Sequence, residues 1–242
     1  MNGKAEKNKL PKVLVGCPVS DYHEYCTEEF IQSIKTLSYP NYDILLIDNS
    51  KDDRFFNSIK DKVPIIRGKY FTKIHDRLAY NRNLLRQKVI DENYDYFFNV
   101  DQDVIPPRDA IERMVSGNKK ITTGIYFNPW EKRGEKRLLA TIWVCPPNQP
   151  EKLVAVREDI VQGDNLIKID SCGSGCLLIH RTVLEKIKFR YDLNEGEGVD
   201  DVFFCQDAKK NDFEIYADTS IKCKHMLSGR TWRWNDMLSG KI

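Results

Sequence analysis

The sequence has no glycine-rich phosphate loop of either common kind. It contains no G-x-G-x-x-G after its first apolar run and no G-x-x-x-x-G-K-[ST] anywhere. The first motif holds the diphosphate of a dinucleotide at a helix N-terminus, and the second holds the phosphates of a nucleoside triphosphate. Their absence argues against a dinucleotide-binding fold and against a P-loop enzyme.

Long apolar runs and a strong net charge are also missing. The longest wholly aliphatic stretches, such as ILLI at 44–47, are too short to cross a bilayer, and no secretory signal is present. The 38 lysines and arginines nearly balance the 36 aspartates and glutamates, so the net charge of +2 does not indicate a nucleic-acid partner. We expect a protein without a transmembrane segment, at most peripheral to a membrane.

The seven cysteines are scattered, odd in number and mostly placed within apolar runs. Examples are Cys17, Cys145, Cys176 and Cys205. Buried thiols behave as small apolar side chains, and disulfide scaffolds belong to oxidising compartments. We therefore expect reduced cysteines and a cytoplasmic location.

The predicted order of strands and helices changes at Gly117. Before it, strands are predicted at 12–17, 42–47, 63–67 and 96–100, and helices at 25–37, 53–60 and 75–90. This alternation builds a mostly parallel sheet wrapped by helices, an α/β fold. After it, strands are predicted at 120–127, 138–145, 153–156, 166–169, 171–180 and 213–217, with helices at 182–186, capped by Thr182, and at 200–210. Because loops join most of these strands, the second half is expected to be mixed, α+β in character.

We expect a single domain over residues 12–226, made of the halves 12–117 and 118–226. Residues 1–11 include the lysine-rich stretch MNGKAEKNK, which is typical of a disordered tail. Residues 227–242 are rich in positive charge and tryptophan and are expected to be flexible.

The most informative stretch is DYFFNVDQDVIPP at 95–107. Its apolar run predicts a strand buried on both faces, which the two prolines prevent from continuing. Asp101 and Asp103 follow at the carboxyl end of that strand, where open α/β sheets bind ligands. Two carboxylates so placed ionise at low cost only beside a cation, which predicts a divalent-metal site that holds a diphosphate. The alternative is an acidic turn that caps the next helix; the central Gln102 carries no information.

Other polar residues lie where they could contact a nucleotide. Asp48 ends the second strand in the sequence D-N-S, and its alternative role is a helix cap or an Asx turn. Arg82 and Asn83 lie near the start of the third helix, where they either contact phosphate or base or form a solvated helix face.

Asp200 and Asp201 are expected at the N-terminus of a helix. The free backbone N–H groups and the helix dipole stabilise an anion there, which would keep the pKa of the carboxylate low. The alternative is a simple N-cap.

His225 is the residue that could complete the metal site. Together with the D-x-D carboxylates it would give an oxygen and nitrogen set that suits Mn²⁺, or Mg²⁺ if the histidine is not bound directly. A competing set for tetrahedral zinc is Cys172, Cys176, Cys223 and His225. The C-x-x-x-C and C-x-H spacings do not match usual zinc pairs, so we favour small buried side chains beside close-packed glycines.

Taken in order, these segments resemble the family 2 glycosyltransferases of the GT-A fold. The likeness covers about 12–225 and is carried by GCPVSD, LLIDNS, AYNRNLL, FFNVDQDV, GSGCLLI, VDDVFFCQDAKKNDFEIYAD and the histidine of KCKHM. It implies a mostly parallel sheet with helices on both faces. It also implies that 12–117 bind the nucleotide sugar and that 118–226 form the acceptor and catalytic half.

The resemblance assigns a role to each candidate residue. Donor contacts are implied for Pro18, Asp48 (to the nucleobase), Arg82, Asn83, Asp101 (near the ribose or the metal) and Arg230. The implied metal ligands are Asp103, Asp101 and His225. Asp200 and Asp201 match the acidic pair of the family, usually Glu-Asp, whose second member is the catalytic base, here Asp201. The sequence departs from the family in the first acid and in lacking the usual arginine after the pair.

The implied reaction transfers a sugar from a UDP- or GDP-linked donor to a hydroxyl of a glycan, lipid-linked glycan or peptide, with inversion and with Mn²⁺ or Mg²⁺. Residues 227–234, with Gly229 as the pivot, would form a lid over the diphosphate. Two other functions are a sugar-phosphate nucleotidyltransferase and a non-catalytic nucleotide-sugar-binding module. The first normally needs a glycine-rich basic loop where this chain has Pro18-Val19-Ser20-Asp21.

Overall fold

The computed structural model describes residues 10–132, 135–150, 152–192, 194, 199–227 and 230–232. The helices are α1 (Thr27–Lys35), α2 (Arg54–Ile59), α3 (Ile74–Asp91), α4 (Ala110–Ser116), α5 (Glu158–Gln162), α6 (Arg181–Leu184) and α7 (Asp200–Lys210), and a 3-10 turn, η1 (Asp21–Cys26), leads into α1. The central strands are β1 (Val13–Gly16), β3 (Tyr42–Ile44), β6 (Tyr96–Val100), β8 (Ile121–Ile125), β13 (Leu166–Ile169), β15 (Cys176–His180) and β16 (Ile215–Lys222). The remaining strands are β2 (Pro18–Val19), β4 (Leu46–Asp48), β5 (Ile65–Arg67), β7 (Val104–Ile105), β9 (Phe127–Lys132), β10 (Glu135–Ala140), β11 (Ile142–Val144), β12 (Val154–Ala155), β14 (Ser171–Cys172), β17 (Lys224–Leu227) and β18 (Arg230–Trp232).

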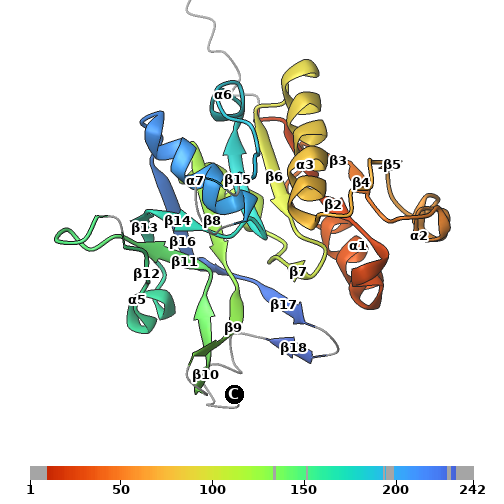
Figure 1. The fold of residues 1–242 in the computed structure, drawn as a ribbon. Helices are drawn as coiled ribbons and strands as arrows, with labels where there is room; N and C mark the ends of the chain where they lie inside the picture. The colour runs from red at the N-terminus through yellow and green to blue at the C-terminus, as the bar shows by residue number, and fades with distance from the viewer. Residues whose placement is uncertain are drawn as a thin grey trace, which may run out of the picture.

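A seven-stranded sheet in the order β13-β16-β8-β15-β6-β1-β3 forms the centre of the molecule (Figure 1). The pairs β1–β3, β1–β6 and β16–β8 are parallel, whereas β15 and β13 run against their neighbours. Five of the seven strands therefore point the same way, which confirms the expected mostly parallel α/β sheet. A smaller parallel sheet, β2-β4-β5, extends it on the N-terminal side.

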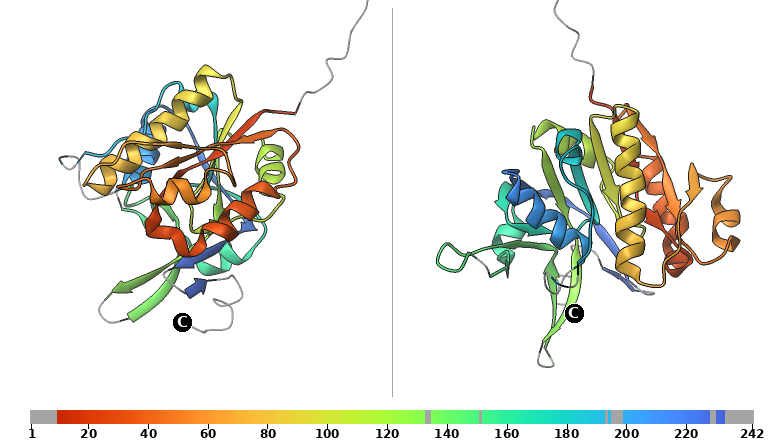
Figure 2. Two further views of the ribbon diagram at one scale, coloured as in Figure 1. Left: turned by 90° about the vertical axis from the view of Figure 1, so that its right-hand side faces the viewer. Right: turned by 45° about the horizontal axis from the view of Figure 1, so that its top comes forward.

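Alternate residues of the central strands build two cores, one on each face of the sheet. Leu14 and Phe97 pack in the cluster that includes residues of α3, α6 and α7. Val13, Val15 and Phe98 pack instead with residues of α1 and α4. Because both faces are covered, the strands read as continuous apolar runs rather than as alternating patterns. Figures 1 and 2 show the helices on both sides of the sheet and the β9–β10 hairpin that projects from the body.

A strand pairing unforeseen from the sequence brings the C-terminal segment to the end of β6. The short β7 pairs with β17, with Val104 opposite His225. The backbone N–H of Met226 also donates to the carbonyl of Asp103, at 2.7 Å. This pairing places His225 beside the D-x-D loop.

The structure departs from the predicted elements at several points. The strand predicted at 42–47 is interrupted at Leu45, so that β3 pairs with β1 and β4 pairs with β2. α5 forms in a stretch predicted as a loop, and α6 is capped by His180, whose Nδ1 accepts from the N–H of Thr182, rather than by Thr182 itself. A strand is predicted from the apolar pattern of several residues together, so a break at a single residue cannot be predicted from that pattern.

The cysteines agree with the expectation of buried thiols. All seven are free, and six of them are buried; Cys145 is half-buried. Within the described ranges, no helix combines the length and the apolar character needed to cross a bilayer.

The break at Leu45 makes Gly16 a position where a side chain cannot fit. A Cβ on Gly16 would lie 2.0 Å from the carbonyl oxygen of Leu45. We expect Gly16→Ala to lower the free energy of unfolding by about 1–3 kcal/mol, because the two strands must move apart. Denaturant unfolding followed by circular dichroism measures this change.

Gly117 is the matched control, because it caps α4 with a φ of −65° and its Cβ would have no contact closer than 3.4 Å. Gly117→Ala should leave stability unchanged or raise it by up to about 1 kcal/mol. Equal effects of the two substitutions would show that the contact with Leu45 does not constrain β1.

Candidate active site

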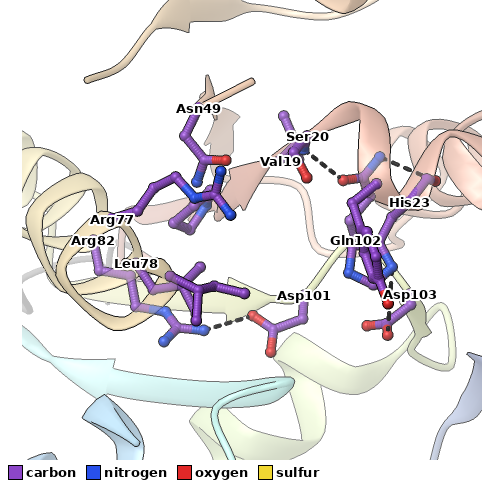
Figure 3. A pocket seen from close by; sticks show the side chains of 13 residues that line it. Val19, Ser20, His23, Asn49, Arg77, Leu78, Arg82, Asp101, Gln102 and Asp103 are labelled. Atoms are coloured by element: carbon purple, nitrogen blue, oxygen red, sulfur yellow. Dashed lines mark hydrogen bonds and ion pairs between the residues drawn. The ribbon is translucent and has the colours of Figure 1, made fainter. Parts of the chain in front are cut away.

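A cavity of about 440 Å³ lies at the end of β2 and β4, between the start of α3 and the loop after β6 (Figure 3). Of the residues predicted to contact a donor, Pro18, Arg82 and Asp101 line it, and so does the predicted metal ligand Asp103. The structure thus brings together, in one cavity, residues from β2, α3 and the D-x-D loop.

Arg82 is a buried cation held between two carboxylates. Its side chain is 4% exposed, and it donates to Oδ2 of Asp200 and, at 3.0 Å, to Oδ1 of Asp101. Burial opposes its charge, but the two carboxylates outweigh burial and raise the pKa of Arg82 above its usual value. The guanidinium therefore joins the end of β6 to the start of α7, and the solvated helix face considered from the sequence is wrong for this residue.

Asp101 is fixed by further contacts at the end of β6. Its Oδ1 also accepts from the side-chain amide of Asn99 at 3.0 Å, and its backbone N–H donates to the carbonyl of Gly175 at 3.1 Å. Its side chain remains 31% exposed, so part of the carboxylate faces the cavity.

Asp200 and Asp201 have different environments although they are adjacent at the start of α7. Asp200 is 1% exposed and is bound to Arg82, whereas Oδ1 of Asp201 is buried and has no hydrogen-bond partner among the described residues. Burial, followed by the charge of Asp200, raises the pKa of Asp201 to about 7. The expectation of a low pKa at this helix N-terminus is therefore wrong for Asp201, because burial and a neighbouring carboxylate outweigh the helix dipole.

Asp103 and His225 form a second polar pair. His225 Nε2 lies 3.2 Å from Oδ2 of Asp103, and its Nδ1 lies 2.7 Å from the carbonyl oxygen of Phe127. Because a carbonyl only accepts, Nδ1 carries a proton and Nε2 faces Asp103. Burial alone would lower the pKa of His225, but the hydrogen bond to Asp103 raises it. Burial likewise opposes ionisation of Asp103, and His225 nevertheless lowers the pKa of Asp103.

The donor atoms of this pair suit a divalent cation. Across the described ranges, no group of three or more His, Cys, Asp or Glu side chains is arranged to hold a metal ion by itself. A carboxylate and an imidazole do suit Mn²⁺, whose remaining ligands in a diphosphate site come from substrate and water. The hydrogen bond from Nδ1 to Phe127 fixes the ring as metal-binding histidines require.

Among the described residues, no three of Cys172, Cys176, Cys223 and His225 are grouped so that they could hold a zinc ion. Sγ of Cys172 lies 4.0 Å from Sγ of Cys205 in the buried core, and His225 faces Asp103. These cysteines are packing residues.

Two predicted donor contacts, Asp48 and Asn83, do not line the cavity. Asp48 is fully buried; its Oδ1 accepts from the N–H of Ser50 at 2.8 Å and its Oδ2 accepts from Arg67, so the Asx turn considered from the sequence is present. Asn83 exchanges two hydrogen bonds with the backbone of Phe189. Arg230 pairs with β17 through its backbone. Its side chain lies outside the described residues, as do Gly229 and residues 228, 233 and 234, which together make up half of the expected lid.

Several cavity residues were missed from the sequence. Gln102 accepts from the N–H of Ser20 at 2.9 Å and donates to Thr27 and to the carbonyl of His23, so it ties η1 to the D-x-D loop. Asn49 and Arg77 also line the cavity. Asn49 could have been noticed as the neighbour of a strand-end aspartate, but nothing in the pattern of the helix distinguishes Arg77 from a solvated side chain.

Three comparisons with known proteins relate this geometry to other molecules. The sequence matches the model of Glycosyl transferase family 2 over residues 24–188, and no curated protein matches the sequence. The GalNAc-T7 structure with UDP, GalNAc and Mn²⁺ is 11% identical, with a TM-score of 0.62 over 93% of this chain and 45% of that one. S. aureus TarS 1-349 in complex with UDP-GlcNAc is 14% identical, with a TM-score of 0.52 over 85% of this chain and 55% of that one.

A third structure, whose chain is covered almost completely, is also similar in fold. The protein A197 from STIV is 16% identical, with a TM-score of 0.50 over 90% of this chain and 87% of that one. The chain spans about half of the TarS and GalNAc-T7 chains. At these identities the likenesses show a shared fold.

The double ion pair of Arg82 predicts a large effect of its removal. We expect Arg82→Gln to lower the free energy of unfolding by about 3–5 kcal/mol, because two carboxylates lose their cation in a buried site. Arg82→Lys should restore only part of this, since an ammonium group cannot bridge both carboxylates as a planar guanidinium does. Urea titration at pH 8 provides the measurement.

Arg157→Gln is the control, because the Arg157 side chain is 78% exposed and pairs only with Asp159 among the described residues. Its loss should change stability by less than about 1 kcal/mol. A similarly small effect at Arg82 would contradict a structural role for this ion pair.

Proposed function

Because this chain belongs to glycosyltransferase family 2, we propose that it transfers a sugar from a nucleoside-diphosphate sugar to an acceptor hydroxyl with inversion at the anomeric carbon. Its family and its fold make it a glycosyltransferase. The observation that carries the finer proposal is that Arg82, which lines the donor cavity, also binds the residue next to Asp201. The side chain of Arg82 therefore links the proposed donor site to the helix that carries the proposed base.

Asp103 and His225 are proposed to hold a divalent cation, Mn²⁺ or Mg²⁺, at the diphosphate. The Mn²⁺ and UDP in the GalNAc-T7 complex support this assignment by analogy. A bound cation supplies charge stabilisation for the departing nucleoside diphosphate. Asp101 lies two residues away with part of its carboxylate facing the cavity, and it is proposed to contact the ribose or the cation.

Asp201 is proposed as the general base. As the acceptor oxygen attacks the anomeric carbon, its proton passes to the Asp201 carboxylate, and the bond from that carbon to the diphosphate oxygen breaks. Asp200 is unsuited to this role because its carboxylate is bound to Arg82. Asp200 is instead proposed to position Arg82 and to raise the proton affinity of Asp201.

The second half of the chain is proposed to bind the acceptor, which we expect to be a glycan, a lipid-linked glycan or a peptide. The β9–β10 hairpin projects from this half and carries Trp130, which is 55% exposed (Figure 2). An exposed aromatic ring is a suitable surface for a sugar or a peptide. A module that only binds nucleotide sugars would have no use for a base with a pKa near neutrality.

The pKa of Asp201 predicts how activity depends on pH. Only the ionised carboxylate accepts a proton, so kcat/KM should rise with pH up to about 7 and level off above it. Asp201→Asn should lower kcat by about 10²–10⁴-fold and leave the affinity for the nucleoside diphosphate unchanged. Release of nucleoside diphosphate from a panel of UDP- and GDP-sugars is the assay.

The same substitution has an opposite effect on stability. The carboxyl of Asp201 ionises near pH 4 in an unfolded chain but only near pH 7 in the folded protein, so stability falls between about pH 4 and about pH 7 and stays at the lower level above it. Asp201→Asn removes this cost, so its Tm at pH 8 should equal or exceed that of the wild type. Normal turnover by Asp201→Asn would show that another group is the base.

The Asp103–His225 pair predicts metal-dependent binding of diphosphates. UDP or GDP with Mn²⁺, at about a hundredfold excess over Kd, should raise the Tm of the wild type by about 5–10 °C. Asp103→Ala should lose the contribution of Mn²⁺, and His225→Ala should weaken it, because each removes a proposed ligand. Thermal melts with and without Mn²⁺ and with EDTA measure this.

Asp61→Ala is a suitable control, since Asp61 is exposed and does not line the cavity. It should show the same metal-dependent shift as the wild type. A full Mn²⁺ effect in Asp103→Ala would place the cation elsewhere.

A further inference from the structure

Apolar side chains are exposed together on the segment that joins β5 to α3 and on the first turns of α3 (Figure 1). Tyr70, Ile74 and Tyr80 are exposed, and the half-buried ring of Phe71 lies 5.2 Å from the ring of Tyr80. Single exposed apolar residues are common on proteins. A group of them with polar residues around it marks a surface that binds another body.

Cations are interleaved with these rings. The Nζ of Lys69 lies 4.8 Å from the centroid of Phe71 and 5.9 Å from the centroid of Tyr80. The Cζ of Arg77 lies 5.0 Å from the centroid of Tyr70. These cation–π contacts connect the side chains of the segment to one another. We call the exposed surface that they form the aromatic–basic patch, and its members are Lys69, Tyr70, Phe71, Lys73, Ile74 and Tyr80.

The aromatic–basic patch lies in a positively charged segment. Residues 68–80 contain Lys69, Lys73 and Arg77, and Asp76 is their one carboxylate. Lys69 and Lys73 are exposed, and neither makes an ion pair with a carboxylate in the part of the chain that the structure describes. Their charges therefore remain for an anionic partner.

Two kinds of anionic partner carry phosphates, a nucleic acid and a membrane surface. Single-stranded nucleic acid stacks its bases on free ring faces, but here a cation covers one face of Phe71 and one face of Tyr70. The exposed Ile74 offers no stacking surface at all. A membrane interface accepts tyrosine rings and aliphatic side chains, while lysines extend to the lipid phosphates. The residues of the patch therefore favour a membrane.

We propose that the aromatic–basic patch docks the protein on a membrane surface that carries anionic lipid headgroups. Tyr70 and Tyr80 enter the interfacial region, and Lys69 and Lys73 contact the lipid phosphates. Ile74 also lines the cavity of the candidate active site, so the docked membrane lies beside that cavity. Docking of this kind needs neither a sugar donor nor a cation, and it goes beyond the proposed function.

Sedimentation of the full chain with lipid vesicles, without donor or metal, tests this inference. Vesicles of phosphatidylcholine with phosphatidylglycerol should bind the wild type at least about tenfold more tightly than vesicles of phosphatidylcholine alone. A higher ionic strength should weaken the binding, because salt screens the lysines from the headgroups.

Variants of the patch should bind the anionic vesicles more weakly. Lys69→Gln combined with Lys73→Gln should weaken binding about twentyfold, since each lysine near the surface contributes about fivefold. Tyr70→Ser and Tyr80→Ser should each weaken it at least about threefold, because less apolar surface enters the interface. Circular dichroism and the Tm show whether each variant is folded.

Matched controls make the same changes outside the patch. Lys152→Gln combined with Lys188→Gln removes the same net charge at exposed positions. Ile160→Ser shortens another apolar side chain, which is 38% exposed as Tyr70 is. Both controls should bind the anionic vesicles as the wild type does. If the control pair weakens binding as much as the pair at Lys69 and Lys73, net charge drives the binding and the inference is wrong.

Two further results would overturn the inference. One is no binding of the wild type to the anionic vesicles at low ionic strength. The other is binding of a fluorescent single-stranded oligonucleotide that the same patch variants lose, without binding to vesicles, which would assign the patch to nucleic acid. Because the assays contain no donor, neither result bears on the proposed sugar transfer.

Discussion

The buried guanidinium of Arg82 is the interaction on which the site depends. It is the cation that allows Asp101 and Asp200, which lie far apart in the sequence, to remain close in a poorly solvated place. Burying a carboxylate without a partner costs several kcal/mol, so the end of β6 and the start of α7 are held together by charge as well as by packing. Arg82 balances the charge of Asp200. Oδ1 of the neighbouring Asp201, in contrast, has no hydrogen-bond partner among the described residues.

A second constraint is topological. The chain leaves the central sheet after β16 and returns as β17 to pair with the short strand β7. That pairing sets His225 against Asp103, and the carbonyl of Phe127 orients the imidazole. Asp103, which lines the cavity, is thus bound by a histidine from the last described strands, and this contact links the two halves of the domain.

The polar residues in and beside the cavity divide by whether their hydrogen bonds are made within the protein. Hydrogen bonds within the protein are made by the side chains of Asp48, Asn83 and Gln102. These bonds hold strand ends, helices and η1 in place. By contrast, Nε of Arg77 and Oδ1 of Asp201 are buried and have no hydrogen-bond partner in the part of the chain that the structure describes. In a buried site this difference separates residues that shape the cavity from residues that await a ligand or a proton.

The sequence by itself determined the fold class, the order of most strands and helices, and the D-x-D carboxylates at the end of β6, because these follow from local apolar patterns and from where a strand must stop. It also indicated Arg82, Asp201 and His225 as candidates from their places in the chain, and the resemblance to a family assigned their roles. Tertiary structure alone decided which of these groups are paired. Burial and neighbours distant in sequence decide whether the carboxylate of Asp48 pairs with Arg67 and whether the pKa of Asp201 lies near 7. They also decide whether Asn49 and Arg77 line a cavity. Those are properties of the packed chain, and no local pattern encodes them.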